Sequence, residues 1–221
     1  MSFTPETIQK DLNSDDFGDR LRGVNQLREL DPKVAFPMIV PLIQDPHVRV
    51  RYAAVSQLDT LGVVDPEKSL ELMRERLQNE PEADVKAAAA DVIGALKLTD
   101  GYEDLVQLYN STTDWMVRMS IVAGVGVLGD PRGFELLKEA LATPEPLVQL
   151  AAVSAFGDLG DPAAIELLLP FVQNDDWQIR QRLVQALSRF DAPEATHALE
   201  TLAQDKAEPV ANYAKDCLAQ R

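Results

Sequence analysis

Apolar positions along this chain follow the spacing of an amphipathic helix, and the same helix returns at regular intervals. The clear copies, with steps of 35, 32, 31, 31 and 31 residues, begin at Val50, Val85, Val117, Val148, Ile179 and Val210. A degenerate copy, DRLRGVNQL, begins at Asp19, 31 residues before Val50. The first, fifth, sixth and ninth places are apolar, as in VQLAAVSAF, and they form one face of an α-helix. The pattern predicts seven copies of one helical unit over nearly the whole chain.

A second helix is indicated in front of most copies by an Asp-Pro dipeptide. Asp caps the free N–H groups of a first helical turn, and Pro at the next position loses no hydrogen bond. The stretches that follow, such as FELLKEAL, carry their own apolar stripe, and no stretch alternates as a β-strand does. We expect an all-α fold, an α-solenoid of seven helix pairs that forms a single domain over residues 1–221. The step of 35 predicts extra residues in or around RERLQNEPEAD.

Charge and composition restrict the partners of such a solenoid. The chain holds 36 acidic and 21 basic residues, and its net charge of −15 repels phosphate backbones and anionic lipid. We therefore expect neither nucleic acid nor a membrane as a partner. The single cysteine, Cys217, excludes an internal disulfide. No apolar stretch reaches the length of a membrane span, and MSFTPETIQKDL does not resemble a targeting segment, so we expect a cytoplasmic protein.

The stretches DPHVRVRYAAVSQLDTLG and NDDWQIRQRLVQALSRF resemble HEAT-like repeats, with an Asp, a Val/Ile-Arg pair and small residues in the second helix. More narrowly, SDDFGDRLRGVNQLREL followed by VRVRYAAVSQL resembles the HEAT-repeat phycocyanobilin lyases and their relatives in phycobilisome degradation. The resemblance implies a protein that attaches or detaches phycocyanobilin at cysteine thioethers of phycobiliprotein subunits, such as those of phycocyanin and allophycocyanin. It carries over no catalytic residue and no further cofactor.

The face opposite the buried stripe holds the candidate binding residues. If the second helices line a groove, the third, seventh and tenth places of each copy face it. These places include Tyr52, Asp91, Met119, Gly126, Leu150 and Gly157. Bare backbone at the glycines would permit close approach of a flat ligand or a partner helix. The alternative is that the glycines serve packing between repeats, which we expect for Gly124.

Two Asp-Trp dipeptides each precede an arginine. Trp115 and Trp177 could stack on a conjugated ring system, and a nearby Arg could pair with a carboxylate. Alternatively, each Trp covers a corner of the repeat. The second place of the copies predicts a structural ladder with acids of the adjacent turn, interrupted by Gln149; its members are Arg51, Lys86, Arg118 and Arg180. Arg182 replaces a small residue of other copies, which makes it a candidate for contact with a ligand or partner.

Conventional catalytic machinery is not evident. His47 and His197 are the only histidines, and neither lies in a His-Glu pair, so no metal site is expected. Two functional classes remain open. In the first, the groove holds a bilin, and Asp91 or Asp176 acts as an acid or accepts pyrrole N–H groups. In the second, the same groove binds a helix of a partner protein without catalysis. Cys217 is either a small half-buried residue or a thiol that holds a bilin in transit.

Overall fold

The computed structural model describes residues 4–221, which form fifteen α-helices and five short 3-10 turns and, within that range, no strand. The chain divides into two compact units, one that ends at Ile121 and one from Val122 to Arg221. The helices of the first unit are α1 (Pro5–Leu12), α2 (Phe17–Gln26), α3 (Pro32–Ile39), α4 (Val48–Ser56), α5 (Leu58–Leu61), α6 (Pro66–Asn79), α7 (Ala83–Ala95) and α8 (Tyr102–Ser111). Helix α9 (Trp115–Leu128) begins in this unit and ends in the second one.

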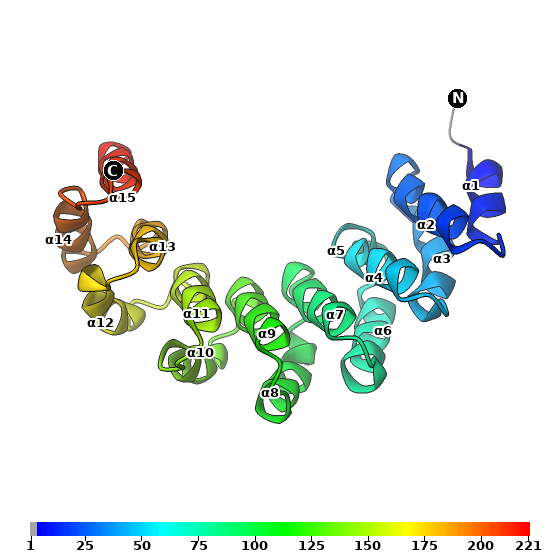
Figure 1. The fold of residues 1–221 in the computed structure, drawn as a ribbon, viewed down its shortest axis with the longest axis horizontal. Coiled ribbons are helices and arrows are strands. Elements are labelled where there is room, and N and C mark those ends of the chain that lie inside the picture. Colours follow the sequence, from blue (N-terminus) through cyan, green and yellow to red (C-terminus); the bar gives the residue numbers. More distant parts are fainter. Residues whose placement is uncertain (1–3) are drawn as a thin grey trace. The chain divides into compact units, whose positions relative to one another are not determined.

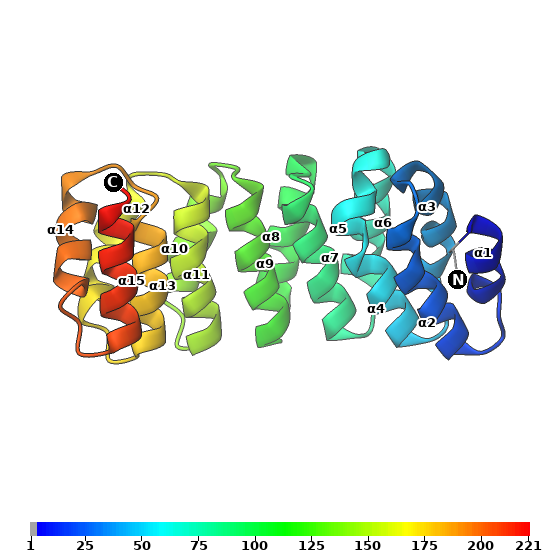
Figure 2. The ribbon, with the colours of Figure 1, turned by 90° about the horizontal axis from the view of Figure 1, so that it is seen from above.

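The first unit is built of helix pairs whose second members lie side by side. Helix α2 packs on α1 and α7 packs on α6, while α4 follows α3 and its 3-10 extension (Figure 1). Within the layer of second helices, α4 contacts both α2 and α7 (Figure 2). The predicted stripe of α4, which continues into the first residue of α5, is fully buried, since Val50, Ala54, Val55 and Leu58 expose no surface. Burial of this stripe between neighbouring repeats holds the unit together.

The second unit repeats this arrangement. Its helices are α10 (Gly133–Leu141), α11 (Pro146–Leu159), α12 (Ala164–Leu168), α13 (Trp177–Leu187), α14 (Pro193–Leu202) and α15 (Glu208–Ala219). Helix α13 contacts both α11 and α15, and the first helices α10, α12 and α14 pack behind them (Figures 1 and 2). The prediction of an all-α solenoid of seven helix pairs is therefore confirmed. The single domain over residues 1–221 stays a prediction, and its first three residues lie outside the described range.

The predicted caps determine where several helices begin. The side chains of Asp31 and Asp65, each followed by a proline as predicted, accept hydrogen bonds from backbone N–H groups in the first turns of α3 and α6. Asp176, which precedes Trp177, caps α13 in the same way, although no cap was predicted there. The Asp130 and Asp161 side chains also accept backbone N–H groups, but α10 and α12 each begin three residues after the aspartate. Gly160 ends α11 with a φ of 73°, a conformation that favours glycine.

The longest repeat lengthens a first helix. Helix α6 has 14 residues and ends with the stretch RERLQN, where the step of 35 predicted extra residues. No helix within residues 4–221 is both long and apolar enough to cross a lipid bilayer.

Candidate functional site

A hollow of about 500 Å³ opens on the second helices of the first unit, where α4, α5, α7 and the first turns of α9 meet. Six of its lining residues stand at the third, seventh and tenth places singled out in the sequence: Tyr52, Ser56, Asp59, Ala87, Asp91 and Met119. The structure thus brings Tyr52, Asp91 and Met119 together on one surface. Their role in binding stays a prediction.

The hollow is largely apolar but carries three carboxylates. Alanines of α7, together with Met116 and Met119 of α9, provide apolar lining, and Tyr52 of α4 remains 45% exposed beside it. Asp59, Asp84 and Asp91 supply the charge, and no Lys or Arg belongs to the lining. Such a surface suits a flat apolar molecule that presents N–H donors to a carboxylate.

Asp91 is the chemically distinctive group of the hollow. The surrounding protein takes water away from its carboxylate, which raises the pKa of Asp91 to about 6, while a hydrogen bond from Ser120 opposes that rise. The Ser120 hydroxyl lies 3.3 Å from Oδ2 of Asp91. The side chain nevertheless remains accessible to a water-sized molecule, because it stands at an open hollow rather than inside the core. Near neutral pH this carboxyl group can therefore take up or release a proton toward a ligand.

Two glycines predicted to form a groove floor have a different position. Gly126 is buried, and a Cβ atom there would lie 2.6 Å from Cα of Ala155. Gly157 is buried in the same way, with Ala186 Cα 2.7 Å from the added atom. The prediction that these glycines face an open groove is wrong, because the tenth place of one helix packs against the eighth place of the next. They permit close packing of neighbouring helices, as the alternative interpretation held.

The other predicted residues lie outside the hollow. Leu150 is half-buried on α11, and Trp115 and Trp177 are 45% and 42% exposed at the first residues of α9 and α13. The Asp176 carboxylate accepts the backbone N–H of Gln178 as a helix cap. Arg182 is exposed and donates to Gln185 on its own helix. None of these residues belongs to the lining of the hollow, and their binding roles stay predictions.

Sequence reasoning missed three polar or polarisable lining residues, Asp84, Met116 and Ser120. Asp84 and Met116 come one residue before their copies begin, and Ser120 stands at the fourth place of its copy. These places lie beside the third, seventh and tenth places on the helix surface. Ser120 carries a hydroxyl one turn from a groove-facing place of its helix, and this is a signal in the sequence for a polar contact.

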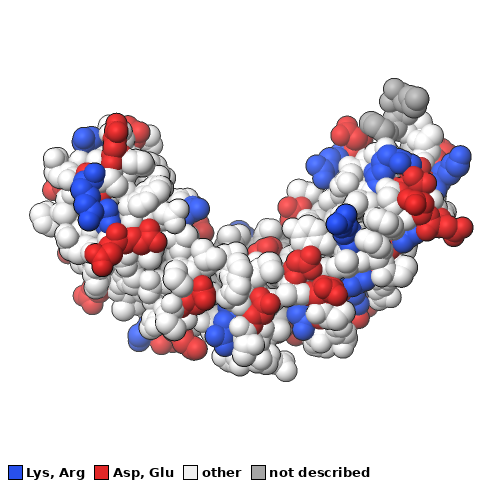
Figure 3. Space-filling model, in the orientation of Figure 1, with Lys and Arg blue, Asp and Glu red and all other residues white. Residues whose placement is uncertain are grey.

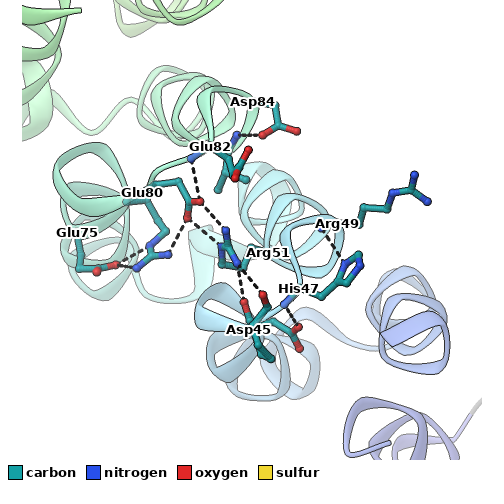
Figure 4. Close-up of polar contacts among 11 residues, drawn as sticks. Asp45, His47, Arg49, Arg51, Glu75, Glu80, Glu82 and Asp84 are labelled. Carbon is teal, nitrogen blue, oxygen red and sulfur yellow. Dashed lines mark hydrogen bonds and ion pairs between the residues drawn. The ribbon is translucent and has the colours of Figure 1, made fainter. Parts of the chain in front are cut away.

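The arginine ladder connects the turns that precede successive second helices, which we call corners. None of its arginines lines the hollow. Arg51 donates through Nε and Nη2 to Glu80, at 3.0 and 2.7 Å, and through Nη1 to the backbone oxygens of Asp45 and Pro46 (Figure 4). The guanidinium of Arg76 adds a second cation to Glu80 at 2.8 Å. Each arginine of this type therefore closes its own corner and binds the corner of the next repeat.

The same geometry recurs at both ends of the chain. Arg180 pairs with Asp205 at 2.6 Å and donates to two corner oxygens, as predicted. Arg20 pairs in the same way with Asp45, also at 2.6 Å, and donates to two backbone oxygens of its own corner. The sequence did not predict this pair, because the first copy of the repeat is degenerate. The arginine and its acid are 25 residues apart in these two pairs and 29 residues apart in Arg51 and Glu80. The difference of four equals the difference between the usual repeat length of 31 residues and the long repeat of 35. The N-terminal helices carry basic and acidic side chains next to one another (Figure 3).

Arg118 departs from the ladder. Its guanidinium carbon lies 5.4 Å from the centre of the Tyr109 ring, and its Nε is buried with no hydrogen-bond partner among the described residues. Gln149, which interrupts the ladder, donates instead to the backbone oxygen of Leu141. Cys217 is half-buried. Within residues 4–221, no group of three or more His, Cys, Asp or Glu side chains is arranged to hold a metal ion.

The repeats match the family model of HEAT repeats over residues 5–94, 70–148 and 134–219. The chain belongs to the HEAT-repeat family. No curated protein sequence matches this HEAT-repeat protein.

Two solved structures are similar to this HEAT-repeat protein in fold. One is the complex of CpcE and CpcF of phycocyanin lyase from Nostoc sp. PCC7120, with a TM-score of 0.66, 19% identity, and coverage of 100% of this chain and 95% of that one. The other is a HEAT-like repeats protein from the archaeon Thermococcus onnurineus NA1, with a TM-score of 0.56, 16% identity, and coverage of 99% and 97%.

Proposed function

We propose that this HEAT-repeat protein handles bilins on phycobiliproteins, and that the hollow around Asp91 is where it binds the tetrapyrrole. The observation that carries the proposal is the pairing of an apolar, ring-sized surface with a carboxylate whose pKa of about 6 leaves it poised to exchange protons. The similarity in fold to the CpcE and CpcF complex of phycocyanin lyase supports this choice of ligand.

A bilin matches the hollow in chemistry. Its conjugated rings suit the alanine and methionine lining and the exposed ring of Tyr52. Its pyrrole N–H groups are donors for the ionised Asp91, and such a charge-assisted hydrogen bond is stronger than a neutral one. Phycocyanobilin is the expected ligand or substrate, and no further cofactor is required.

The reaction at a bilin thioether needs only proton transfer. Attachment adds a cysteine S–H across a carbon–carbon double bond of the bilin, so that sulfur bonds one carbon and the proton ends on its neighbour. Detachment is the reverse elimination, in which the C–S bond breaks and the thiol regains its proton. No oxidant or reductant enters either direction. Asp91 can carry the proton, since both of its protonation states are populated near neutral pH.

The physiological setting we propose is phycobilisome turnover. The N-terminal stretch resembles the cyanobacterial phycobilisome-degradation protein NblB, and phycocyanin and allophycocyanin subunits are the partners that such a role requires. Either detachment or attachment of the bilin would serve it.

The test mixes purified protein with chromophore-bearing phycocyanin and follows absorbance and zinc-induced fluorescence of the subunits on denaturing gels. We expect loss of covalent bilin with the unaltered chain, or its gain when apo-subunit and free phycocyanobilin are supplied. Asp91→Asn should slow either change at least tenfold, whereas Asp216→Asn, an exposed carboxylate on α15, should not. No spectral change with free bilin or with phycocyanin would contradict the proposal.

The alternative is a non-catalytic adaptor that binds a helix of a partner protein. One observation favours it: three carboxylates around an apolar hollow also suit a basic amphipathic helix. Stable binding of apo-subunit, with no response to free bilin, would select the adaptor.

A further inference from the structure

The charge around the hollow has one sign. Its lining contains the carboxylates of Asp59, Asp84 and Asp91 and neither a lysine nor an arginine. The whole chain carries a net charge of −15, which adds to the negative potential at this surface. A ligand therefore enters this hollow most favourably with its positive or N–H-bearing side first.

A bilin carries charge of the opposite kind at another edge. Its two propionates are anionic at neutral pH, whereas its pyrrole nitrogens lie along the ring system and act as donors. Bringing a propionate beside Asp91 would place like charges within a few ångströms of each other, which is unfavourable. Pyrrole N–H groups at the same place would satisfy the carboxylate.

The residues that line the hollow include no lysine or arginine that could anchor a propionate there. Arg51 is already committed to Glu80 and to two backbone oxygens. Arg182 was predicted from the sequence to contact a ligand or partner. It lies on α13 in the second unit and donates to Gln185. The lining thus recognises a bilin without a cationic partner for its carboxylates.

We propose that the hollow selects open-chain tetrapyrroles by their N–H edge, which Asp91 and Ser120 receive, and leaves both propionates outside in water. This inference rests on the proposed function and deepens it, because it states which edge of the ligand is recognised. It predicts that a bilin whose propionates are blocked binds as well as the free acid does.

The experiment titrates the full chain with phycocyanobilin and with its dimethyl ester at pH 7.5 and follows the absorbance of the bilin. We expect dissociation constants within about threefold of each other, or tighter binding of the ester. Raising the salt concentration should tighten the free acid, because salt screens the repulsion of its propionates, and should leave the ester unchanged. Asp91→Asn should weaken both ligands about tenfold or more, the effect of losing a hydrogen bond to a charged group. Asp216→Asn should weaken neither.

The contrary outcomes separate the inference from the function on which it rests. Ester binding at least tenfold weaker than that of the free acid, with salt weakening the acid, would mean that cations hold the propionates, and it would overturn the inference alone. Equal binding of both ligands that Asp91→Asn does not change would also overturn it, because recognition would then not use this carboxylate. Binding of neither ligand would overturn both the inference and the proposed function.

Discussion

Two sets of carboxylates in the first unit have opposite surroundings. Asp45 and Glu80 are buried, and burial, the largest single influence, would raise the pKa of each, but hydrogen bonds from Arg20 or Arg51, a backbone N–H donor and nearby positive charge together outweigh it and leave both pKa values lowered. Among the described residues, Asp91 receives one side-chain hydrogen bond, from Ser120, and burial raises its pKa to about 6. Carboxylates therefore stabilise the corners, whereas the carboxylate in the hollow has no cationic partner among the lining residues.

The difference separates stability from function. A carboxylate with a lowered pKa stabilises the fold above its unfolded pKa, and this contribution is lost as the pH falls through the folded value. Asp91 has the opposite sign: its ionised form costs stability, and the cost grows from the unfolded pKa of 3.8 to its full size above about 6. A group retained at such a cost, in an accessible hollow, is a candidate for binding or catalysis.

The largest expected effect is at a corner. Arg51→Ala removes the bidentate partner of Glu80, which is only 1% exposed, and two bonds to corner oxygens. Breaking a buried pair from one side costs about 3–5 kcal/mol, and we expect a loss of this order, somewhat reduced because Arg76 still contacts Glu80. Chemical denaturation measures it. Arg49→Ala, two residues earlier and exposed, is the matched control and should change stability by less than about 0.5 kcal/mol.

The second effect tests the packing role of a glycine. Gly126→Ala should destabilise the protein by about 1–3 kcal/mol, because its Cβ would meet Ala155. Helix propensity alone predicts the opposite sign, a gain of about 1 kcal/mol. Adding Ala155→Gly should recover part of the loss, and a double-mutant cycle gives this coupling. Stabilisation by Gly126→Ala alone would restore the groove-floor interpretation.

The third effect concerns the hollow itself. Asp91→Asn removes a charge that its surroundings disfavour, so we expect a higher melting temperature than that of the unaltered chain at pH 7.5 and little difference at pH 4. Thermal unfolding followed by circular dichroism at the two pH values provides the comparison. If Asp91→Asn instead destabilised the protein, and did so most at pH 7.5, the ionised Asp91 would stabilise the fold as Asp45 and Glu80 do.

The smallest expected effect is a change in the pKa of Asp91. Ser120→Ala removes the hydrogen bond that favours the ionised carboxylate, so the pKa of Asp91 should rise further above its usual value. Carbon-detected NMR titration of the aspartate side chains measures the shift. A pKa of Asp91 that falls in this variant would mean that Ser120 does not donate to it.

Much of the fold was predictable because the sequence of each repeat contains its own apolar stripe and most repeats contain a helix-capping aspartate. The residues of α4 that a 3.6-residue period buries are indeed buried, and Asp31 and Asp65 cap the helices expected of them. The site was predictable only in part. A single-helix projection places Tyr52 and Asp91 at the surface correctly, but it ignores the next repeat, which covers the tenth place.

The sequence did contain a signal for that error. Gly126 and Gly157 at the tenth place each face an alanine at the eighth place of the following copy, Ala155 and Ala186. Two small residues at fixed places in successive repeats indicate close helix packing. The pairing of Ser120 with Asp91 had no such signal, because the step between copies three and four does not by itself define which side chains face each other.

The most direct test of the account is the pKa of Asp91 with and without bound phycocyanobilin, measured by NMR on protein with labelled aspartate carboxyl carbons. Free protein should give a value of about 6, and a saturating bilin should lower it, because pyrrole N–H donors stabilise the ionised carboxylate. A bilin that binds yet leaves the Asp91 pKa unchanged would contradict the claim that this hollow holds it.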